Sequence, residues 1–558
     1  MTINHISSEK GSLRFGIMGD VKEIPKDYNI KTILYFSDNG INNAIKEWGS
    51  IIRMYNGKPS SQVSRDSDFT LQYLGYTTDN GMYYYYNTGD YSNYLDTLVG
   101  VKDYADSEGI PYRYVLLDSW WYYKGDNGGV TDWTARPDVF PNGDLSELYT
   151  KTGWLVQAHN RYWSNQTVYA KQNGGSYNFL FDSGSMGGAV PLDQSFWNDL
   201  FKSSSQWGLK VYEQDWLFNE FYIYVKQMVE NVNLGKTWLH QMGKAASLNG
   251  LTIQYCMPYI RHLLQSVEIA SVTQARASDD YVVYPHEGTP NWRIGGQSLL
   301  IDALGLAPSK DGFWSTHRQA KNPYGENRFE PNPSLQALVA TLSTGPVAIG
   351  DGIGYSDAKL IMRSCAKDGL ILNPSSPATK IDKAMLQNAF GGSGPDGEIW
   401  YAPSSIHYRK FGYLFAADVT ISSNLVPTDL DHKLTNSEYW AVMNNDDIHE
   451  KVAVKFSSSS PLTLKLTKIP EEFNFYAIIP IESNGWSFYG ELNKWVSVSQ
   501  RRVTNIDAYD EGMSATVKGT TDEDISLAFI CPKGKFHITK CTFGLTQVLT
   551  IHSNGQCI

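Results

Sequence analysis

The amino-acid sequence predicts an α/β fold in which a (β/α)8 TIM barrel follows a short N-terminal extension and precedes a C-terminal antiparallel β-sandwich. From residue 71 to about residue 357, short β-rich apolar runs alternate with longer helical patterns. Such alternation is typical of βαβ units around a parallel sheet. Beyond about Gly397 the helical periodicity fades, and short alternating runs separated by turn residues favour a sandwich. We therefore expect an extension at 1–66, a barrel at 67–396 and a sandwich at 397–558.

The N-terminal extension contains two patterned segments. Lys31–Phe36 is a run typical of a strand, and Ile41–Tyr55 has the spacing of an amphipathic helix. Asn56-Gly57-Lys58-Pro59 follows directly and is a normal helix-breaking sequence. The extension should therefore form one strand and one helix ahead of the barrel.

The barrel region supplies seven or eight βα units over ~290 residues, which fits a closed barrel better than an open doubly wound sheet. No Gly-x-Gly-x-x-Gly turn follows the first strand, which argues against dinucleotide binding. The expected strands are Leu71–Tyr76, Tyr112–Leu117, Gly153–Gln157, Leu209–Gln214, Leu251–Cys256, Val272–Ala275 and Pro346–Ile349. The helical patterns between them include Asn93–Glu108, Gln194–Ser205, Glu220–Leu248 and Pro258–Ile269.

The pattern of the C-terminal region predicts a series of short strands separated by turn-prone residues. The absence of a long low-complexity linker indicates a packed joint with the barrel and not a flexible tether. The expected strands are Tyr413–Val419, Tyr439–Met443, Val452–Phe456, Leu462–Leu466, Phe475–Ile479, Ser526–Cys531 and Gln547–Ile551.

Charge and hydropathy exclude several classes of partner. The 558 residues carry a net charge of −11, which argues against a phosphate-binding surface and hence against nucleic acid. No stretch approaches the ~20 consecutive apolar residues that a membrane helix needs. Met1–Gly11 is polar and lacks the order of a secretory leader. We therefore expect a cytoplasmic protein, or a secreted one if the chain is the processed form of a longer precursor. The sequence does not indicate the oligomeric state.

Cysteines and aromatic residues add two more expectations. Five cysteines exclude a disulfide scaffold, although one bridge is possible among Cys531, Cys541 and Cys557. The 16 Trp and 36 Tyr exceed what a generic core requires. Sugar-binding clefts use such rings as stacking platforms, while most of the rings here should pack in the core.

Carboxylates end several predicted strands, where a barrel carries its chemistry. Asp79 follows the first strand, Asp118 the second, Asp215 the fourth, and Asp279 with Asp280 the sixth. One such residue is often only a helix N-cap. Four strand ends with acidic residues on one rim, amid Trp and Tyr, are harder to explain in that way.

A pair of carboxylates is the minimum machinery for glycoside hydrolysis. In the retaining mechanism one attacks the anomeric carbon and the other protonates the leaving oxygen, with the two ~5–5.5 Å apart. The period of two along a strand places Glu213 and Asp215 on one face, so both could enter the lumen. Asp215 lies nearer the strand end and is the expected nucleophile. Asp279 and Asp280 are adjacent, so at most one is the acid/base.

Other chemistries lack their motifs. No His-Glu-x-x-His is present, and His159, His240, His262 and His286 show no ligand spacing for zinc. The glycine-rich segment 182–188 lacks the Lys-Ser/Thr of a phosphate loop. No Gly-x-Ser-x-Gly nucleophile elbow occurs at a strand–helix junction. We expect neither a metal nor an organic cofactor.

Several segments resemble one known family. Arg276-Ala277-Ser278-Asp279-Asp280-Tyr281, followed by Tyr284-Pro285, is similar to a segment of raffinose synthases and alkaline α-galactosidases in glycoside hydrolase family 36. Leu342–Asp351 with Gly354–Asp357, then Asp368–Leu372 and Pro377–Asp382, resemble the same group around the last barrel strand, and Leu74–Asp79 resembles its first strand. The segments occur in the family's order, and the resemblance covers about residues 30 to 385.

The resemblance implies roles for individual residues. Asp215 would be the nucleophile and Asp280 the acid/base, with Asp279 as its substitute. The pocket for the terminal sugar would include residues carried over from the family and, beside them, neighbours at the strand ends: Asp79, Asp118, Trp120, Trp121, His159, Lys210, Glu213 and Arg276.

Three features depart from the family pattern. The second strand of the galactosidases ends in two Asp residues, whereas here Ser119 follows Asp118. The family's Lys-x-Asp on the fourth strand is replaced by Lys210-Val211-Tyr212-Glu213-Gln214-Asp215, so the nucleophile assignment depends on register. Much of the family's large N-terminal β-sandwich has no counterpart in this sequence.

The sequence thus predicts a retaining, exo-acting α-glycosidase, most similar to α-galactosidases, acting on an oligosaccharide or glycoconjugate. It would hydrolyse or transfer a terminal α-linked sugar through a covalent glycosyl-enzyme intermediate. Two alternatives stay open at this point. One is a catalytically inactive carbohydrate-binding protein on the same barrel, and the other is an α-glucosidase-type hydrolase.

Overall fold

The computed structural model describes residues 2–7, 12–58, 61–285, 290–392, 394–434, 438–443, 452–467 and 472–558. Eight parallel strands form the central sheet in the order β14-β13-β12-β11-β7-β4-β3-β15. A parallel bridge between Phe313 and Ile349, with a hydrogen bond from Gly350 N to Phe313 O (3.0 Å), joins its two edges and closes the barrel. The strands are β3 (Gly75–Thr77), β4 (Tyr114–Leu117), β7 (Leu155–Asn160), β11 (Leu209–Gln214), β12 (Thr252–Tyr255), β13 (Val272–Arg276), β14 (Ala307–Ser309) and β15 (Ala348–Ile349).

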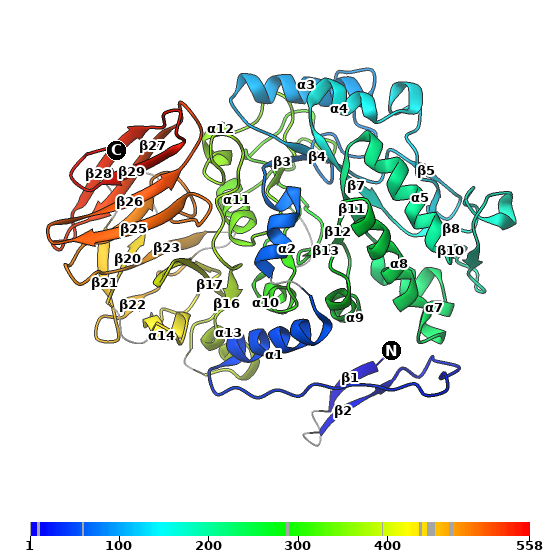
Figure 1. Cartoon of the computed structure of the whole chain (residues 1–558), viewed down its shortest axis with the longest axis horizontal. Coiled ribbons are helices and arrows are strands. Elements are labelled where there is room, and N and C mark those ends of the chain that lie inside the picture. Colours follow the sequence, from blue (N-terminus) through cyan, green and yellow to red (C-terminus); the bar gives the residue numbers. More distant parts are fainter. Residues whose placement is uncertain are drawn as a thin grey trace.

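This architecture confirms the predicted (β/α)8 barrel with a C-terminal β-sandwich (Figure 1). Seven of the eight barrel strands lie where the sequence predicts them, and Leu209–Gln214 matches to the residue. The seventh strand, β14, was not predicted. It has only three residues, one of them Pro308, so it offers neither length nor alternation as a signal.

Helices surround the barrel and cover its outer face (Figure 1). Asn93 begins one of them by accepting a hydrogen bond from the Asp96 N–H at 2.9 Å, the expected N-cap contact. The helices of the barrel region are α3 (Tyr94–Ser107), α4 (Ser146–Thr152), α5 (Gln194–Ser204), α6 (Leu217–Asn219), α7 (Gln227–Glu230), α8 (Leu234–Leu248), α9 (Ile260–Gln265), α10 (Gly295–Ala303), α11 (Pro333–Leu342), α12 (Ala358–Ile361) and α13 (Asp382–Phe390).

The single long helix predicted for Glu220–Leu248 is wrong. The segment forms one π-helical turn, Glu220–Tyr224, and then α7 and α8. Val225 is extended, and the Asn231 side chain accepts hydrogen bonds from the N–H groups of Asn233 and Leu234. These local bonds offer the backbone an alternative to a continuous helix, which explains the break.

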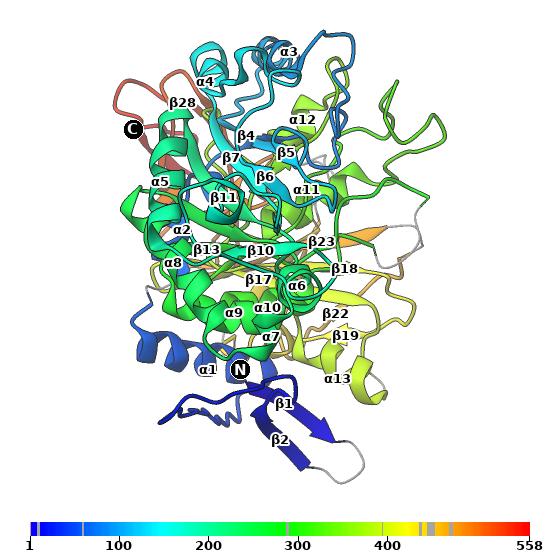
Figure 2. The same cartoon turned by 90° about the vertical axis from the view of Figure 1, so that its right-hand side faces the viewer.

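The N-terminal segment contributes helices α1 (Ile41–Asn56) and α2 (Ser61–Ser67) and a hairpin of β1 (Thr2–Ser7) and β2 (Ser12–Ile17), which extends away from the barrel (Figure 2). Gly57 ends α1 in the left-handed conformation, as the breaker sequence predicts. The strand predicted at Lys31–Phe36 is wrong, because this segment is irregular and leaves Leu34 and Phe36 85% exposed.

Helix α1 packs directly on α10. The ideal Cβ position of Gly49 lies 2.2 Å from the carbonyl oxygen of Ala303, so only glycine fits there. At the start of α1, the Asp382 carboxylate accepts hydrogen bonds from the N–H groups of Ile41 (2.8 Å) and Asn42 (3.0 Å). These contacts attach the extension to the barrel.

A small mixed sheet follows the second and third barrel strands, a feature that the sequence analysis did not predict. Its order is β5-β6-β8-β10-β9. The strands are β5 (Tyr123–Lys124), β6 (Val130–Asp132), β8 (Trp163–Ser164), β9 (Phe179–Phe181) and β10 (Gly188–Pro191).

The C-terminal part consists of antiparallel sheets. Its largest sheet has the order β16-β17-β18-β23-β20-β21, and two three-stranded sheets, β24-β27-β28 and β25-β26-β29, lie beyond it (Figure 1). The elements are β16 (Thr379–Lys380), β17 (Glu398–Ile406), β18 (Arg409–Ala417), β19 (Asn424–Leu425), α14 (Pro427–Leu430), β20 (Tyr439–Met443), β21 (Ala453–Phe456), β22 (Leu462–Thr463), β23 (Phe473–Pro480), β24 (Ser487–Glu491), β25 (Val503–Tyr509), β26 (Gly512–Lys518), β27 (Asp524–Ile530), β28 (Phe536–Thr542) and β29 (Val548–His552). The boundaries at residues 66 and 396 stay predictions.

Polar contacts and one disulfide hold this part together and join it to the barrel. Lys494 donates to the carbonyls of Met362 (2.7 Å) and Cys365 (2.6 Å), and the Arg363 guanidinium lies over the Trp495 ring. Cys541 pairs with Cys557, one of the bridges that the sequence allowed. The joint is therefore packed. No helix among the described residues is long and apolar enough to cross a membrane.

Candidate active site

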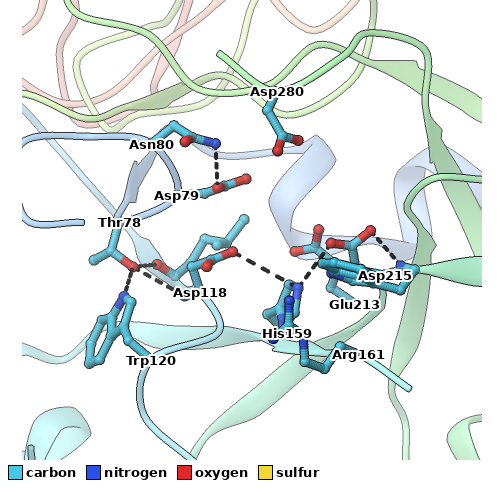
Figure 3. Close-up of polar contacts among 12 residues, drawn as sticks. Thr78, Asp79, Asn80, Asp118, Trp120, His159, Arg161, Glu213, Asp215 and Asp280 are labelled. Atoms are coloured by element: carbon cyan, nitrogen blue, oxygen red, sulfur yellow. Dashed lines mark hydrogen bonds and ion pairs between the residues drawn. The ribbon is translucent and has the colours of Figure 1, made fainter. Parts of the chain in front are cut away.

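Charged side chains gather at the carboxyl ends of the barrel strands, the edge where such barrels carry their chemistry (Figure 3). They come from the ends of five strands. Asp79 follows β3, Asp118 follows β4 and His159 belongs to β7. Glu213 lies in β11 and Asp215 directly after it, while Arg276 ends β13 and Asp280 comes four residues later. The parallel order of the strands brings these distant residues to one rim.

The backbone turns sharply where three of these strands end. Asn80 after β3, Trp216 after β11 and Met257 after β12 all have positive φ, at 48°, 58° and 47°. A side chain in this left-handed region costs about 1–3 kcal/mol and persists only where surrounding structure imposes it. Strained backbone therefore surrounds the mouth of the barrel on several sides.

Asp215 is held on both oxygens. His159 Nε2 lies 3.0 Å from Oδ2, and the N–H of Trp216 donates to Oδ1 at 2.6 Å. Tyr122 Oη in turn lies 2.9 Å from His159 Nδ1. Burial alone would raise the pKa of Asp215, but the hydrogen bond and the charge of His159 hold that pKa below its usual value. Asp215 is therefore ionised over a wide pH range.

His159 belongs to the same chain of contacts. Burial would lower the pKa of His159, but Asp118, at 4.0 Å, and Asp215 raise it above its usual value. A cationic His159 would face two carboxylates and would stabilise both as anions.

Glu213 lies deeper in the lumen than Asp215, since it is two residues earlier on β11, and only 1% of it is exposed. It accepts a hydrogen bond from Gln157 Nε2 at 3.2 Å. Burial raises the pKa of Glu213 to about 7, although His159 opposes this shift. The carboxyl groups of Glu213 and Asp215 thus have pKa values displaced in opposite directions.

Arg276 organises the other side of the mouth. Its guanidinium pairs with Asp79 (3.3 Å), with Asp311 (3.2 Å) and with Asp280. Burial, together with Asp311 and Asp118, raises the pKa of Asp79 well above its usual value. Asp79, Asp280 and Asp311 could hold a cation by their mutual distances, but Arg276 already supplies the positive charge between them.

Asp280 faces the open side of the site, with 63% of its side chain exposed. Desolvation in the mouth raises the pKa of Asp280 to about 6, with Arg276 opposing and with Asp311 and Asp215 adding to the shift. Figure 3 shows the carboxyl group of Asp280 directed toward the space between Asp79 and Asp215. The arrangement thus pairs a group that ionises readily with one that retains its proton up to about pH 6.

Three residues predicted to line the sugar pocket are not among the side chains accessible at the barrel mouth. Lys210 is exposed at the amino end of β11, because the strand runs in the register that sends Glu213 and not Lys210 into the lumen. Trp120 is fully buried behind the site, where it stacks on Tyr94 at 3.8 Å and donates to Thr78 Oγ1. Trp121 is also fully buried and packs on Trp133. Both indoles form core and not a platform at the mouth.

The other predicted residues divide into two groups. Asp79, Asp118, His159, Glu213, Asp215 and Arg276 are buried or nearly so and come together at the mouth. Asp279 is exposed, whereas its neighbour Asp280 contacts Arg276. The geometry therefore favours Asp280 over Asp279 as the group that faces Asp215.

Sequence reasoning missed several residues of the site. Asp311 follows the unpredicted strand β14 and accepts hydrogen bonds from the N–H groups of Tyr281 (2.6 Å) and Gly312 (2.7 Å). Arg161 lies over the ring of Trp216, with its guanidinium carbon 4.3 Å from the centroid. Tyr122 was visible only as part of an aromatic run. The signal for Asp311 was its position in Lys310-Asp311-Gly312 directly after a short apolar segment.

Comparisons with known proteins bear on the fold. No protein-family model matches the sequence. A search of curated proteins also finds no match.

Among solved structures, Abp, a family 27 β-L-arabinopyranosidase from Geobacillus stearothermophilus, is similar at 14% identity and a TM-score of 0.53, with 74% of this chain and 97% of that one covered. A variant of Abp solved with arabinose gives a TM-score of 0.51, with 14% identity over 74% of this chain and 98% of that one. The family 36 α-galactosidase AgaA from the same organism has a TM-score of 0.47 and 12% identity, with 80% of this chain and 60% of that one covered. At such identity the likeness to Abp shows the fold, a barrel with a C-terminal β-sandwich.

Proposed function

We propose that this protein is a retaining, exo-acting α-glycosidase that releases or transfers a terminal α-linked sugar. The observation that carries the proposal is the pair Asp215 and Asp280, from the ends of β11 and the segment after β13, with pKa values displaced in opposite directions. Carboxyl pairs whose surroundings separate their pKa values divide into an ionised group and a proton donor. Retaining glycoside hydrolysis needs one of each.

The first half of the reaction uses both groups. Asp215 attacks the anomeric carbon, and the bond from that carbon to the leaving oxygen breaks as the carbon–carboxylate bond forms. Asp280 gives its proton to the leaving oxygen. The products of this step are the free alcohol and a glycosyl ester on Asp215.

The second half reverses the roles. Asp280, now ionised, removes a proton from water or from a sugar hydroxyl, whose oxygen attacks the anomeric carbon and displaces Asp215. Water as acceptor gives hydrolysis, and a sugar gives transglycosylation. Two displacements at one carbon leave its configuration unchanged.

The surrounding residues would orient the sugar. Asp79 and Asp118 are buried carboxyl groups at the mouth, suited to hydrogen bonds with sugar hydroxyls, and Arg276 holds Asp79 and Asp280 in place. His159 keeps Asp215 ionised. Arg276 and His159 thus act by positioning other residues, whereas Asp79 and Asp118 would touch the sugar itself.

Support for a galactoside comes from the family 36 resemblance. It also comes from Abp, which is named as a β-L-arabinopyranosidase. A β-L-arabinopyranoside has the ring configuration of an α-D-galactoside without its hydroxymethyl group. Ser119, in place of the family's second Asp, removes one charged acceptor for sugar hydroxyls. We therefore include the pentopyranoside among the candidate substrates.

The test is hydrolysis of 4-nitrophenyl α-D-galactoside, β-L-arabinopyranoside and α-D-glucoside. We expect release of nitrophenol from the first or second at the highest rate. Preference for the glucoside would favour the α-glucosidase alternative, and binding of sugar without release would favour the inactive carbohydrate-binding protein.

A variant identifies the nucleophile. Asp215→Gly should lower turnover by about a thousandfold or more, because the covalent step is lost. Sodium azide should restore turnover and give a glycosyl azide of inverted configuration, since azide fits the space left by the carboxylate. Rescue in Glu213→Gly but not in Asp215→Gly would move the nucleophile to Glu213.

A further inference from the structure

A second cavity lies outside the site described above. It has a volume of about 380 Å³ and is formed by the segments after β4 and β6 together with α5 and the turn that follows it. We call it the indole cavity after Trp121, Trp133 and Trp207, which line it with Tyr177 and Asp199. None of the charged residues at the barrel mouth lines it.

Aromatic rings form much of its wall. The centroid distances are 5.1 Å between Trp121 and Trp133, 6.0 Å between Trp121 and Trp207, and 5.9 Å between Trp133 and Trp207. Trp121 and Trp133 are buried, whereas Trp207 is partly exposed. The cavity is therefore a cluster of three indoles with one ring at its opening.

The polar lining has unused hydrogen-bonding capacity. The exposed Asp199 accepts a hydrogen bond from Tyr177 Oη at Oδ2 (2.8 Å), which leaves its other oxygen for a further donor. Ser203 adds an exposed hydroxyl.

The charge of the lining restricts the ligand. No lysine or arginine among the described residues lines the cavity, whereas Asp144 and Asp199 do. Both oxygens of Asp144 already accept hydrogen bonds from Ser146. Anionic ligands such as phosphates are thus excluded, and a neutral ligand rich in hydroxyl groups remains.

From these contacts we infer that the indole cavity is a second sugar-binding site, which takes a neutral pyranose ring of an oligosaccharide. A pyranose presents C–H groups on its faces, which pack on indole rings, and hydroxyl groups around its edge. One hydroxyl can donate to the second oxygen of Asp199 and another can bond with the exposed hydroxyl of Ser203. The volume falls within the ~300–1,000 Å³ of small-molecule sites.

The cavity and the barrel mouth share one wall. The Trp133 indole N–H donates to the carbonyl oxygen of His159 at 3.0 Å, and His159 contacts Asp215. Trp133 thus lies between the cavity and the strand that carries His159. The inference itself does not depend on the proposed catalytic function, because it stands on the lining of the cavity alone.

Isothermal titration calorimetry with raffinose and with maltotriose tests the inference. The titrations use the full chain carrying Asp215→Asn, so that turnover adds no heat. In this background we expect Trp207→Ala to weaken one binding event at least tenfold. Trp207→Phe, which retains a ring, should recover much of that loss, and Asp199→Asn should weaken the same event by about tenfold.

The matched control is Trp486→Ala, since Trp486 is also partly exposed but lies in the C-terminal part. Equal binding by the Trp207→Ala and Trp486→Ala proteins would overturn the inference. So would binding of choline chloride that depends on Trp207 while neither sugar binds, because an aromatic cluster with a carboxylate can also hold a quaternary ammonium ion.

The two proposals fail separately. If the nitrophenyl glycosides show no turnover but Trp207-dependent binding persists, the catalytic proposal fails and the second site stands. If turnover is present and Trp207→Ala binds both sugars as the control does, the second site fails and the enzyme stands.

Discussion

At the scale of single residues, the division between Asp215 and Asp280 is the central feature. Their neighbours explain it: His159 stabilises the anion of Asp215, while desolvation and the surrounding carboxylates favour the protonated form of Asp280. Neither effect could be derived from the spacing of the residues in the sequence. It depends on which side chains of other strands lie next to them.

The pH dependence of kcat/KM should reflect this division. The acid must be protonated in the first step, so activity should fall as the pH rises through the pKa of Asp280, about 6. Asp280→Asn should remove that alkaline limb and lower kcat/KM about 10²–10⁴-fold on substrates that need protonation of the leaving group. A 2,4-dinitrophenyl glycoside, whose leaving group needs no proton, should be affected far less. Asp279→Asn is the control, and a limb that moved with Asp279 would reassign the acid.

Glu213 should make stability depend on pH. Its pKa is raised from 4.5 to about 7 in the folded protein, so the unfolded chain loses this proton first as the pH rises. The contribution of protonated Glu213 to the free energy of unfolding is complete below about pH 4.5 and is lost between about pH 4.5 and 7. Glu213→Gln should therefore raise Tm relative to the wild type at pH 8 and change it little at pH 4.5. A difference in Tm that is the same at both values of pH would contradict this cause.

At the scale of elements, short-range patterns predicted most strands and helices, and long-range contacts decided the rest. β11 has six residues with clear burial, and its bounds were predicted to the residue. β14 has three residues and owes its existence to pairing with β13, so Asp311 was missed with it. Lys31–Phe36 has the composition of a strand, but no described strand lies beside it to complete a ladder.

The register of β11 illustrates the same limit within the site. The sequence analysis placed both Lys210 and Glu213 near the nucleophile, although residues three positions apart lie on opposite faces of one strand. Pairing with β7 aligns Glu213 with His159 and thereby settles the position of both. The two buried tryptophans after β4 were misassigned for a related reason, since composition does not reveal whether a ring faces solvent or core.

The docking of α1 offers a test on two helical glycines. Gly49→Ala places a methyl group against the backbone of Ala303 and should destabilise the protein by about 1–3 kcal/mol. Gly296→Ala in α10 has no atom within 4 Å of the new Cβ and should stabilise it by about 0.5–1 kcal/mol. Urea denaturation measures both. If the two changes had the same sign, the close contact would not be what requires glycine at position 49.

At the scale of the whole molecule, the barrel and the β-sandwich share one joint. Lys494 reaches from the segment after β24 to two carbonyls of the barrel side, and Arg501 donates to the carbonyls of Leu71 (3.0 Å) and Ile371 (3.1 Å). The sequence indicated a packed joint only by the absence of a linker. The contacts themselves join residues more than 100 positions apart, which no local pattern records.

We expect the joint to make unfolding cooperative. Scanning calorimetry should show one transition, and Lys494→Met should lower its Tm without splitting it, because two carbonyls lose a charged donor worth about 1.5–3 kcal/mol. Lys533→Met, at an exposed position, should leave Tm unchanged. Two separated transitions in the wild-type protein would show that the barrel and the sandwich unfold independently.

The two hydrogen bonds on Asp215 also constrain its geometry. One oxygen is tied to the N–H of left-handed Trp216 and the other to His159, so the carboxylate plane cannot rotate. In the proposed mechanism the carboxylate therefore meets every glycoside in one fixed orientation. A glutamate at position 215, one methylene longer, would move the carboxylate away from both partners, so the length of this one side chain sets the direction of the proposed attack.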